Sequence, residues 1–475
     1  MDPSFAISSM QDTICALATP PGLSAIGVIR VSGKISFAVI DKVFTPRNKQ
    51  LLISQVDSHT VHLGDFMNDN EVIDEVLVSV FKGPHSYTGE DSVEISCHGS
   101  AYIEQKILET LINLGLRLAR PGEFTMRAFL NGKYDLSQAE AVADLISSHS
   151  RTSHDLALNQ MRGLFSNRIK HLRKQLLEFA SLLELELDFS QEDVEFADRK
   201  DFMRLLNDMT QEITGLTNSF SMGNVLKKGI PVAIIGEPNV GKSTLLNAIL
   251  NEDRAIVSEI PGTTRDAIED TIVINGISFR FIDTAGLREA GDQIESMGIE
   301  RTFEKIDQAK IILLVFDVSR SSYSGTGTDM DVISEHLSYL PEDIQKDKKI
   351  IFIANKTDLL IESPKGFKSL VEMECLFVSA KRKENINLII DSLSKYVEAE
   401  KISDNAMVSS ARHYEALVKT LESLESVRAG FDQNLSTDLI AIDLRQALHY
   451  LGEITGEITT NELLENIFST FCIGK

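Results

Sequence analysis

The chain has 475 residues, of which 43% are hydrophobic and 25% are charged, as is usual for a globular protein. It is too long for one domain, and about two to four domains are expected. With 47 basic and 70 acidic residues, its formal net charge of −23 argues against nonspecific binding of nucleic acid or membranes through overall charge. No apolar run approaches the length of a membrane span and no signal pattern is present, so we expect a cytoplasmic protein that binds no membrane.

Residues 12–133 alternate short strand-like runs with helical ones, and this mixture predicts an α+β domain. Residues 24–31, 75–81 and 92–96 have the pattern of strands, whereas residues 103–114 have the spacing of a helix. Three other stretches are dense in turn and polar residues, and periodicity alone favours reading them as connecting loops: residues 18–22, 85–91 and 120–124.

Helical patterns dominate residues 136–220 and return after residue 405. The first segment carries apolar residues at three- and four-residue steps, which predict a core-facing stripe rather than a cofactor contact: Leu176, Phe179, Leu183 and Leu187. Residues 459–462 offer a capping box for the last helix. Because insertions succeed where chain ends lie close together, the two flanking segments predict one helical domain with another domain inserted into it.

The nonapeptide GEPNVGKST at residues 236–244 is the stretch around which the chain is organised. It follows the apolar residues 230–235, which read as a buried strand, and precedes residues 245–250, which read as a helix. Such a turn aims backbone N–H groups and the positive end of a helix dipole at one point, where a triphosphate can sit. Lys242 can then reach the β- and γ-phosphates, and the Ser243 hydroxyl can ligate Mg²⁺. The sequence therefore predicts a phosphate-binding P-loop.

Strands and helices alternate through residues 226–400, which predicts a doubly wound, mostly parallel sheet. The Asp283 carboxylate, at the end of one strand, can hold the Mg²⁺ shell through water. The Asp358 carboxylate can accept from guanine N1–H and N2–H₂, and because adenine lacks that donor pair the site selects GTP. Three strand-end motifs follow the P-loop in this order and together with it predict a GTPase: DTAG at 283–286, NKTD at 355–358 and SAK at 379–381.

Residues 258–266 lie between the P-loop and Asp283, and this position predicts the first switch loop. Thr264 can complete the Mg²⁺ shell there only when the γ-phosphate is present. Leu287, which follows the DTAG motif, cannot orient a water molecule, so another group must position the nucleophile. The polar, acidic residues 288–295 predict a second switch, although their pattern alone also fits a solvated acidic surface.

From end to end the chain closely resembles the bacterial and organellar tRNA-modification GTPase family (MnmE/TrmE type). The resemblance rests on six stretches: ATPPG at 18–22, residues 85–91, RPGEF at 120–124, RAFLNGK at 127–133, GTTRD at 262–266 and the terminal FCIGK at 471–475. It implies a multidomain α/β protein with an inserted Ras-like P-loop G domain. The domains it implies are an α+β folate-binding and dimerising domain at 1–133, an all-helical domain from 134–225 and 401–475, and the G domain at 226–400.

The same resemblance implies that a homodimer works with an FAD- and NADH-dependent partner of the MnmG/GidA type. Together they would add a carboxymethylaminomethyl-type group to carbon 5 of the wobble uridine of certain tRNAs. The one-carbon unit would come from 5,10-methylenetetrahydrofolate, of which 5-formyltetrahydrofolate is an analogue. Matching motif by motif, the folate contacts would be Arg30, Glu94, Lys133 and Lys475, and Cys472 would be the family's functionally important tail cysteine.

Potassium-dependent GTP hydrolysis across a dimer of G domains is implied as well, with K⁺ in place of an arginine finger. Glu295 would orient the attacking water. The implied ligands are Ser243 and Thr264 for Mg²⁺, and Asn239, Ser258, Ile260 and Thr263 for K⁺. The implied GTP-binding residues are Asn239, Val240, Gly241, Lys242, Ser243, Thr244, Ser258, Glu259, Ile260, Pro261, Gly262, Thr263, Thr264, Asp283, Thr284, Ala285, Gly286, Asn355, Lys356, Thr357, Asp358, Ser379, Ala380 and Lys381.

Two other interpretations remain open at this stage. A nucleotide-dependent regulatory or ribosome-assembly GTPase would carry the same G motifs, although the acidic balance and the lack of an appended basic RNA-binding module disfavour it. Apart from the resemblance, residues 472–475 read as a frayed chain end, as chain ends usually are.

Overall fold

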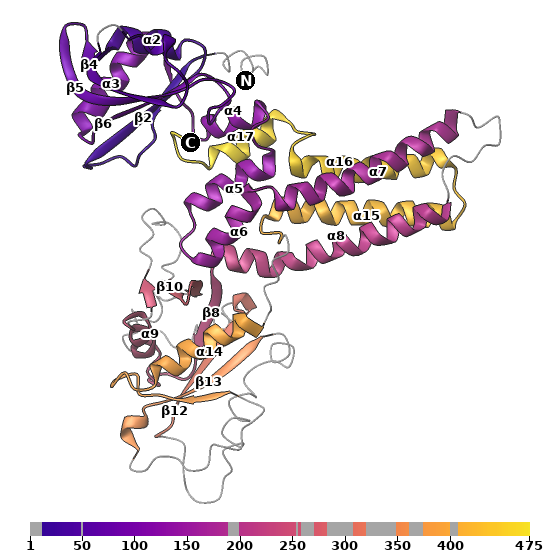
Figure 1. Cartoon of the computed structure of the whole chain (residues 1–475). Coiled ribbons are helices and arrows are strands. Elements are labelled where there is room, and N and C mark those ends of the chain that lie inside the picture. Colours follow the sequence, from indigo (N-terminus) through magenta and orange to yellow (C-terminus); the bar gives the residue numbers. More distant parts are fainter. Residues whose placement is uncertain are drawn as a thin grey trace, which may run out of the picture. The chain divides into compact units, whose positions relative to one another are not determined.

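The computed structural model describes residues 12–48, 51–188, 199–252, 255–257, 270–282, 307–319, 348–360, 374–399 and 407–475 (Figure 1). The chain forms two compact units. The first comprises residues 1–146, 158–214 and 415–475, and the second comprises residues 147–157 and 215–414. None of the helices in the described ranges is both long and apolar enough to cross a membrane.

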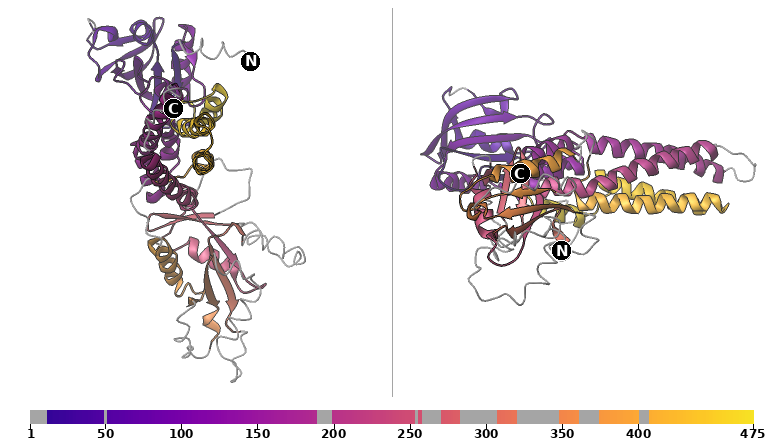
Figure 2. Two further views of the ribbon diagram at one scale, coloured as in Figure 1. Left: turned by 90° about the vertical axis from the view of Figure 1, so that its right-hand side faces the viewer. Right: turned by 90° about the horizontal axis from the view of Figure 1, so that it is seen from below.

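The N-terminal part of the first unit is built on a sheet of seven described strands in the spatial order β3-β4-β5-β6-β2-β1-β7 (Figures 1 and 2). Its neighbouring strands are antiparallel except β1 and β7, which are parallel. This mixture of strands and helices confirms the predicted α+β class. The strands are β1 (Ile14–Leu17), β2 (Ile26–Ser32), β3 (Phe44–Pro46), β4 (Thr60–Asn68), β5 (Glu71–Phe81), β6 (Ser92–His98) and β7 (Arg117–Leu118).

One face of this sheet is covered by α2 (Ser36–Val43) and α3 (Ala101–Asn113), and a short 3₁₀ helix, η2 (Ile53–Gln55), packs beside α2. Ile29 and Val31 of β2 are fully buried in the core that these helices close. Because successive side chains of a strand point to opposite faces, Arg30 lies on the face away from α2 and α3. The polar side chains described below lie on that face.

The rest of the first unit is helical (Figures 1 and 2). Four long helices lie side by side, and Phe202 joins three of them, stacking on Phe179 at 3.5 Å between ring centroids and meeting Phe431 at 4.9 Å. The helices are α4 (Glu123–Leu130), α5 (Leu136–Ile146), α6 (Arg151–Met161), α7 (Leu164–Asp188), α8 (Arg199–Lys228), α15 (Ala411–Asp432), α16 (Thr437–Thr455) and α17 (Asn461–Ser469), of which α6, α8 and α15 extend into the second unit.

The predicted core-facing stripe of α7 is confirmed for Leu176, Phe179 and Leu183, which are all buried. The fourth member, Leu187, has a side chain outside the described residues. At the last helix the capping residue is Thr460, whose hydroxyl accepts from the Leu463 N–H at 3.2 Å. A hydroxyl at this position satisfies one of the N–H groups that the first turn leaves unpaired, and α17 therefore begins at Asn461.

The second unit contains another sheet of seven described strands, ordered β14-β13-β12-β8-β11-β10-β9. The five strands from β14 to β11 are parallel, and β10 and β9 continue the sheet antiparallel. The prediction of a doubly wound sheet is confirmed. Its elements are β8 (Ile230–Ile235), α9 (Lys242–Leu250), β9 (Ala255–Val257), β10 (Asp270–Ile274), β11 (Ile277–Phe281), β12 (Ile311–Asp317), β13 (Lys349–Asn355), the 3₁₀ helix η3 (Thr357–Leu359), β14 (Cys375–Phe377) and α14 (Ile386–Ala399).

The central strands of this sheet are buried on both faces. Every residue of β8 and of β12 is buried, which explains their unbroken apolar sequences IPVAII and IILLVFD. Helices α9 and α14 contribute to the core on one face. Because the carboxyl ends of parallel strands meet at one edge, the loops after β8, β12 and β13 lie together, and this edge is the expected place for a ligand.

Candidate functional site

The predicted P-loop connects β8 to α9, as its pattern indicated. Gly241 is the residue before α9 and has a φ of 97°, and a Cβ added there would lie 2.5 Å from the Asn355 amide nitrogen. Glycine is therefore required by both the backbone conformation and the close approach. The Lys242 ammonium donates to the Gly236 and Glu237 carbonyls at 2.8 and 2.7 Å, so it lies over the loop that would surround a phosphate.

Two residues of the NKTD motif donate hydrogen bonds from their side chains to backbone carbonyls of the P-loop. The Asn355 side chain, 2% exposed, donates to the Val240 carbonyl at 2.8 Å and accepts from the Ala380 N–H at 3.0 Å. The Lys356 ammonium donates to the Asn239 carbonyl at 2.7 Å. The P-loop, the NKTD motif and the SAK motif, distant in sequence, thus form one hydrogen-bonded cluster.

The carboxylate predicted to select the base also has a fixed position. Asp358 lies in η3, which follows β13 after the single residue Lys356, and one of its oxygens accepts from the Ser379 hydroxyl at 2.7 Å. The SAK motif therefore orients the Asp358 side chain as well as contacting Asn355. Twelve of the predicted GTP-site residues lie outside the described residues: Ser258, Glu259, Ile260, Pro261, Gly262, Thr263, Thr264, Asp283, Thr284, Ala285, Gly286 and Glu295.

A second group of predicted site residues meets on the sheet of the first unit. Arg30 of β2 and Glu94 of β6 are paired directly across the strands, and the guanidinium donates to one Glu94 oxygen through Nε at 2.9 Å and Nη2 at 2.8 Å. The guanidinium lies over the Tyr87 ring, 4.9 Å from its centroid. Tyr87 is itself held by a 2.8 Å hydrogen bond between its hydroxyl and that of Thr125. The Arg30 head group therefore has one defined position.

The chain end lies against the same group. The Phe124 N–H donates to the Lys475 carbonyl at 3.2 Å, the Gly122 N–H donates to the Cys472 carbonyl at 3.3 Å, and Arg30 donates to the Gly474 carbonyl at 3.4 Å. Burial and the neighbouring Arg30 charge lower the pKa of the Lys475 ammonium. The tail is therefore docked, and the interpretation of a frayed end is wrong.

Lys133, the fourth predicted folate contact, has a different neighbour. Its ammonium donates to the Pro84 carbonyl at 3.1 Å, in the segment that leads into the loop carrying Tyr87. The structure thus brings Arg30, Glu94 and Lys475 together, while the described contact of Lys133 is with that loop. The Cys472 side chain is exposed.

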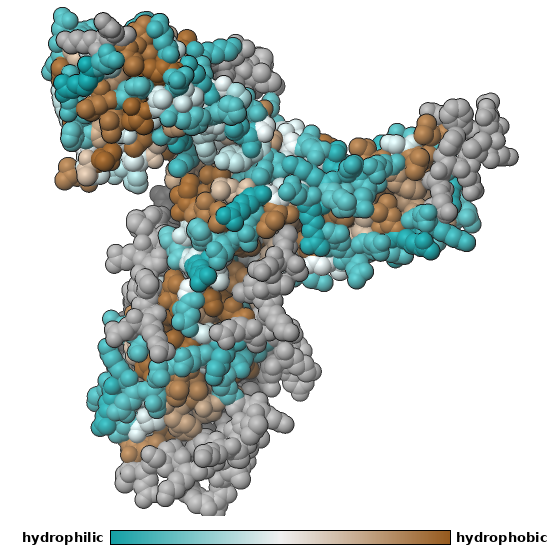
Figure 3. Space-filling model, viewed as in Figure 1, coloured by the Kyte–Doolittle hydropathy of each residue, from teal (hydrophilic) through white to brown (hydrophobic). Residues whose placement is uncertain are grey.

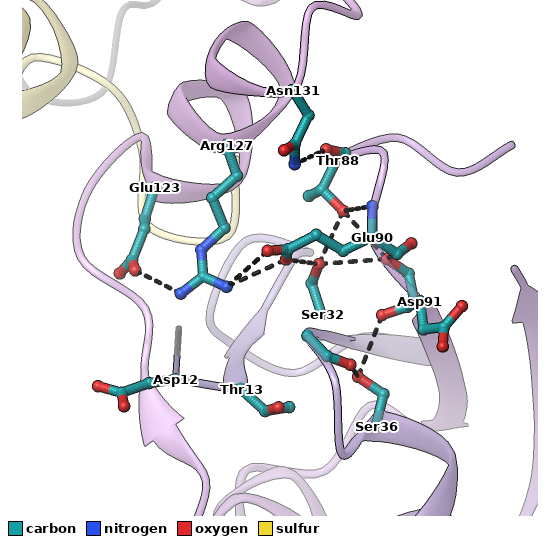
Figure 4. A network of polar contacts seen from close by, with 12 residues as sticks. Asp12, Thr13, Ser32, Ser36, Thr88, Glu90, Asp91, Glu123, Arg127 and Asn131 are labelled. Carbon is teal, nitrogen blue, oxygen red and sulfur yellow. Dashed lines mark hydrogen bonds and ion pairs between the residues drawn. The ribbon is translucent and has the colours of Figure 1, made fainter. Parts of the chain in front are cut away.

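Sequence reasoning missed the buried ionic network shown in Figure 4. The Arg127 side chain is 2% exposed and donates to Glu123 at 3.0 Å and to Glu90 at 3.0 and 3.3 Å. Burial alone would raise the pKa of Glu123, but hydrogen bonds from Arg117, the Arg120 amide and Arg127 hold that pKa below its usual range. The four-residue spacing of Glu123 and Arg127 on a short helix was a signal for an ion pair. Glu90 lies 37 residues from Arg127 and gave no such signal.

Replacing Arg127 by Met is expected to lower the stability of the folded chain by about 3 kcal/mol or more. The change removes the buried cation from Glu90 and leaves Glu123 with only Arg117, whose side chain is 31% exposed. Thermal unfolding of the full chain followed by calorimetry measures the effect. The matched control is Arg204→Met, which removes a pair with Asp201 whose side chains are 79% and 73% exposed. That change is expected to cost less than about 1 kcal/mol. Equal effects in the two variants would contradict a structural role for the network.

A P-loop held by an NKTD motif, at the carboxyl edge of a doubly wound sheet, is the site of a P-loop GTPase. In this chain the sheet that carries the site is combined with an α+β domain and a helical bundle. Two family models cover nearly all of the chain: "GTP-binding protein TrmE N-terminus" matches residues 13–133 and "MnmE helical domain" matches residues 136–472. The chain belongs to the MnmE family of tRNA modification GTPases, as its sequence motifs predicted.

Curated relatives agree with this assignment over their full length. The tRNA modification GTPase MnmE of Flavobacterium johnsoniae is 52% identical, with 98% of this chain and 99% of the relative covered. The protein of the same name from Flavobacterium psychrophilum is also 52% identical at the same coverage, and that of Bacteroides fragilis is 51% identical over 98% of this chain and all of the relative. The protein is therefore a GTPase of tRNA modification, and the alternative of a ribosome-assembly GTPase is not supported.

Proposed function

We propose that GTP binds at the carboxyl edge of the second sheet and that its hydrolysis drives or resets a modification of the wobble uridine of tRNA. The observation that carries the proposal is the cluster in which Asn355 and Lys356 hold two P-loop carbonyls. Asp358 would accept from the guanine base, Lys242 would bind the β- and γ-phosphates, and Ser243 with Thr264 would hold Mg²⁺. The other GTP contacts would be those of the switch, DTAG and SAK motifs.

A potassium ion is proposed to take the place of an arginine finger, held by Asn239, Ser258, Ile260 and Thr263 in a dimer of G domains. Asn239 has the left-handed φ of 62° within the P-loop. A side chain carried by so constrained a backbone can serve as a fixed ligand. Glu295 is proposed to orient the attacking water, since Leu287 cannot.

A reduced folate is proposed to bind at Arg30, Glu94, Lys133 and Lys475. The residues fit such a molecule, because Arg30 and Lys475 place two cations near one carboxylate and the charge of Arg30 already disfavours protonation of Lys475. An anionic folate tail would relieve that repulsion, and Glu94 can accept from the donors of a pterin. Bound methylenetetrahydrofolate would supply the one-carbon unit, while these side chains bind and orient it.

The remaining parts of the proposal follow from the family assignment. A homodimer and a flavin- and NADH-dependent partner protein would carry out the carboxymethylaminomethyl-type modification in the cytoplasm, where tRNA is found. The functional domains would be residues 1–133 for folate binding and dimerisation, 226–400 for GTP, and 134–225 with 401–475 for the helical domain and its tail. Cys472, whose side chain is exposed in this tail, would be the functionally important tail cysteine.

Turnover of GTP is expected to be at least about tenfold faster in KCl than in NaCl of equal concentration at fixed Mg²⁺, because bound K⁺ would provide part of what an arginine finger contributes. Equal ionic strength separates a specific ion site from screening. Specific activity should also rise with protein concentration if two G domains must meet. The measurement is phosphate release over a range of protein concentrations.

Two asparagine variants show whether the response to K⁺ depends on Asn239. Asn239→Ala should remove the response to K⁺, whereas Asn247→Ala, at an exposed position on α9, should keep it. If turnover of the unmodified chain ignores the cation, the potassium site is refuted and hydrolysis without a monovalent cofactor, as in a regulatory GTPase, becomes the better description.

A further inference from the structure

An aspartate that belongs to none of the predicted motifs lies at the edge of the proposed GTP site. Asp317 is the last residue of β12 and stands in register with Asn355 of β13. Its side chain is 5% exposed, and one carboxylate oxygen accepts from the Ser319 N–H at 3.0 Å and from the Ser319 hydroxyl at 2.7 Å. These two bonds fix the direction of the other carboxylate oxygen.

That other oxygen contacts Lys356. The Lys356 ammonium donates to the Asp317 carboxylate at 2.7 Å and to the Asn239 carbonyl at 2.7 Å. One cation therefore joins the end of β12, the NKTD motif and the P-loop. The Lys356 backbone has a left-handed φ of 68°, which turns the chain between β13 and Asp358.

We propose that Asp317 is a positioning residue for guanine nucleotide binding, which holds the Lys356 ammonium on the Asn239 carbonyl and so ties the base-recognition motif to the P-loop. The inference rests on the proposed GTP site and adds a residue to it. Asp317 acts through Lys356, and no contact between Asp317 and the nucleotide is required.

The physical reason is the flexibility of a lysine side chain. Lys356 is 27% exposed, so without an anion its ammonium would gain by turning toward water, where it is strongly hydrated. A charge-assisted hydrogen bond to a fixed carboxylate opposes this. Burial alone would raise the pKa of Asp317, but the hydrogen bonds from Lys356 and Ser319 outweigh it and hold that pKa below its usual range. The carboxylate is thus charged at neutral pH, as the role demands.

The test is Asp317→Asn in the full chain, with the fluorescent nucleotide N-methylanthraniloyl-GDP as probe. The amide keeps the shape and can still accept from Ser319, but it no longer attracts the ammonium. We expect dissociation of the probe to be about tenfold faster, and the KM for GTP to rise by about the same factor while kcat changes by less than about twofold, since the loss of one charge-assisted bond affects binding rather than the chemical step.

A matched control lies at the start of β13, the strand that Lys356 follows. Lys349, the first residue of β13, pairs with Glu374 at 2.8 Å, and both side chains are about a third exposed, at 37% and 30%. Glu374→Gln removes this lysine–carboxylate pair far along the strand from the P-loop. It should leave both the dissociation rate and KM within about twofold of the unmodified chain.

A double-mutant cycle with Lys356→Met shows whether Asp317 acts through the lysine. If it does, adding Asp317→Asn to Lys356→Met changes the dissociation rate little further, because the two changes remove the same link. Additive effects would overturn the proposal and assign Asp317 a general structural role. An unchanged dissociation rate in Asp317→Asn alone would overturn it as well. If the unmodified chain fails to bind the probe, the proposed GTP site itself is at fault.

A second, milder variant tests the proposal even if Asp317→Asn prevents folding. Ser319→Ala removes a hydrogen bond that fixes Asp317 and leaves both charges in place. It should accelerate probe dissociation by about threefold, in the same direction as Asp317→Asn but by less. No acceleration in Ser319→Ala, together with loss of folded protein in Asp317→Asn, would count against positioning and for a purely structural residue.

Discussion

Replacing Asp358 by Asn is expected to weaken GTP binding by about 10⁴-fold, because the site would then present a donor to the donors of guanine. The Asp358 carboxylate is held in place by the Ser379 hydroxyl, so the variant amide cannot simply turn away. Xanthine carries a carbonyl where guanine carries its amino group, and that carbonyl can accept from the new amide. The affinity for xanthosine triphosphate should therefore rise as that for GTP falls.

Competition of GTP and of xanthosine triphosphate against N-methylanthraniloyl-GDP, or against its xanthosine counterpart, measures both affinities. The control is Glu384→Gln, close to the SAK motif, where the Glu384 side chain is 54% exposed beside Arg382. That variant should bind both nucleotides as the unmodified chain does. A loss of affinity for both nucleotides in Asp358→Asn would indicate a disturbed fold, and no change for either would remove Asp358 from the base site.

Deleting residues 472–475 is expected to abolish measurable binding of 5-formyltetrahydrofolate and to leave GTP turnover within about twofold of the full chain. The tail lies beside Arg30, and a Cβ added at Gly474, whose φ is 92°, would lie 2.3 Å from the Leu17 carbonyl oxygen. This close fit leaves no space for a side chain at residue 474 and holds the tail beside Arg30, which is one of the residues proposed to bind folate. Phe471 remains in the truncated chain and keeps its place in the core with Phe468.

Calorimetric titration with 5-formyltetrahydrofolate and phosphate release from GTP are the two measurements. Lys475→Met, which keeps an unbranched side chain one atom shorter and removes the charge, should weaken folate binding by about tenfold. Lys174→Met, at a side chain 75% exposed on α7, is the matched control and should have no effect. Loss of both activities after the deletion, or of neither, would contradict the assignment of the tail to the folate site.

The fold followed from local patterns to a large extent. The unbroken apolar run of β8, the alternation of strands and helices through residues 226–400 and the three- and four-residue steps of α7 were sufficient to predict a doubly wound sheet and a helical domain. Such patterns are local, because neighbouring residues determine which faces of a strand or helix are apolar. The cap of α17 shows the limit of such reasoning. Thr459 and Thr460 both offer a hydroxyl, and the backbone conformation, with Thr460 extended, decides which of them caps.

Within the proposed GTP site, the sequence alone identified the P-loop, NKTD and SAK motifs, because each is a short run whose chemistry depends on adjacent residues. It did not identify Asp317, whose partner Lys356 lies 39 residues further on. The same holds for the network of Arg127 and Glu90. A single carboxylate in a sequence does not reveal which cation it will meet after folding.

The sequence by itself thus determined the family, the class of fold and the motifs of the proposed GTP site, since these depend on spacing within a few residues. Only the tertiary structure decided that the chain end is docked beside Arg30 and that Asp317 holds Lys356. Both facts depend on which distant segments of the chain lie side by side after folding. Hydrogen bonds and ion pairs form between atoms that are close in space, and closeness in space across strands is set by the packing of the whole core.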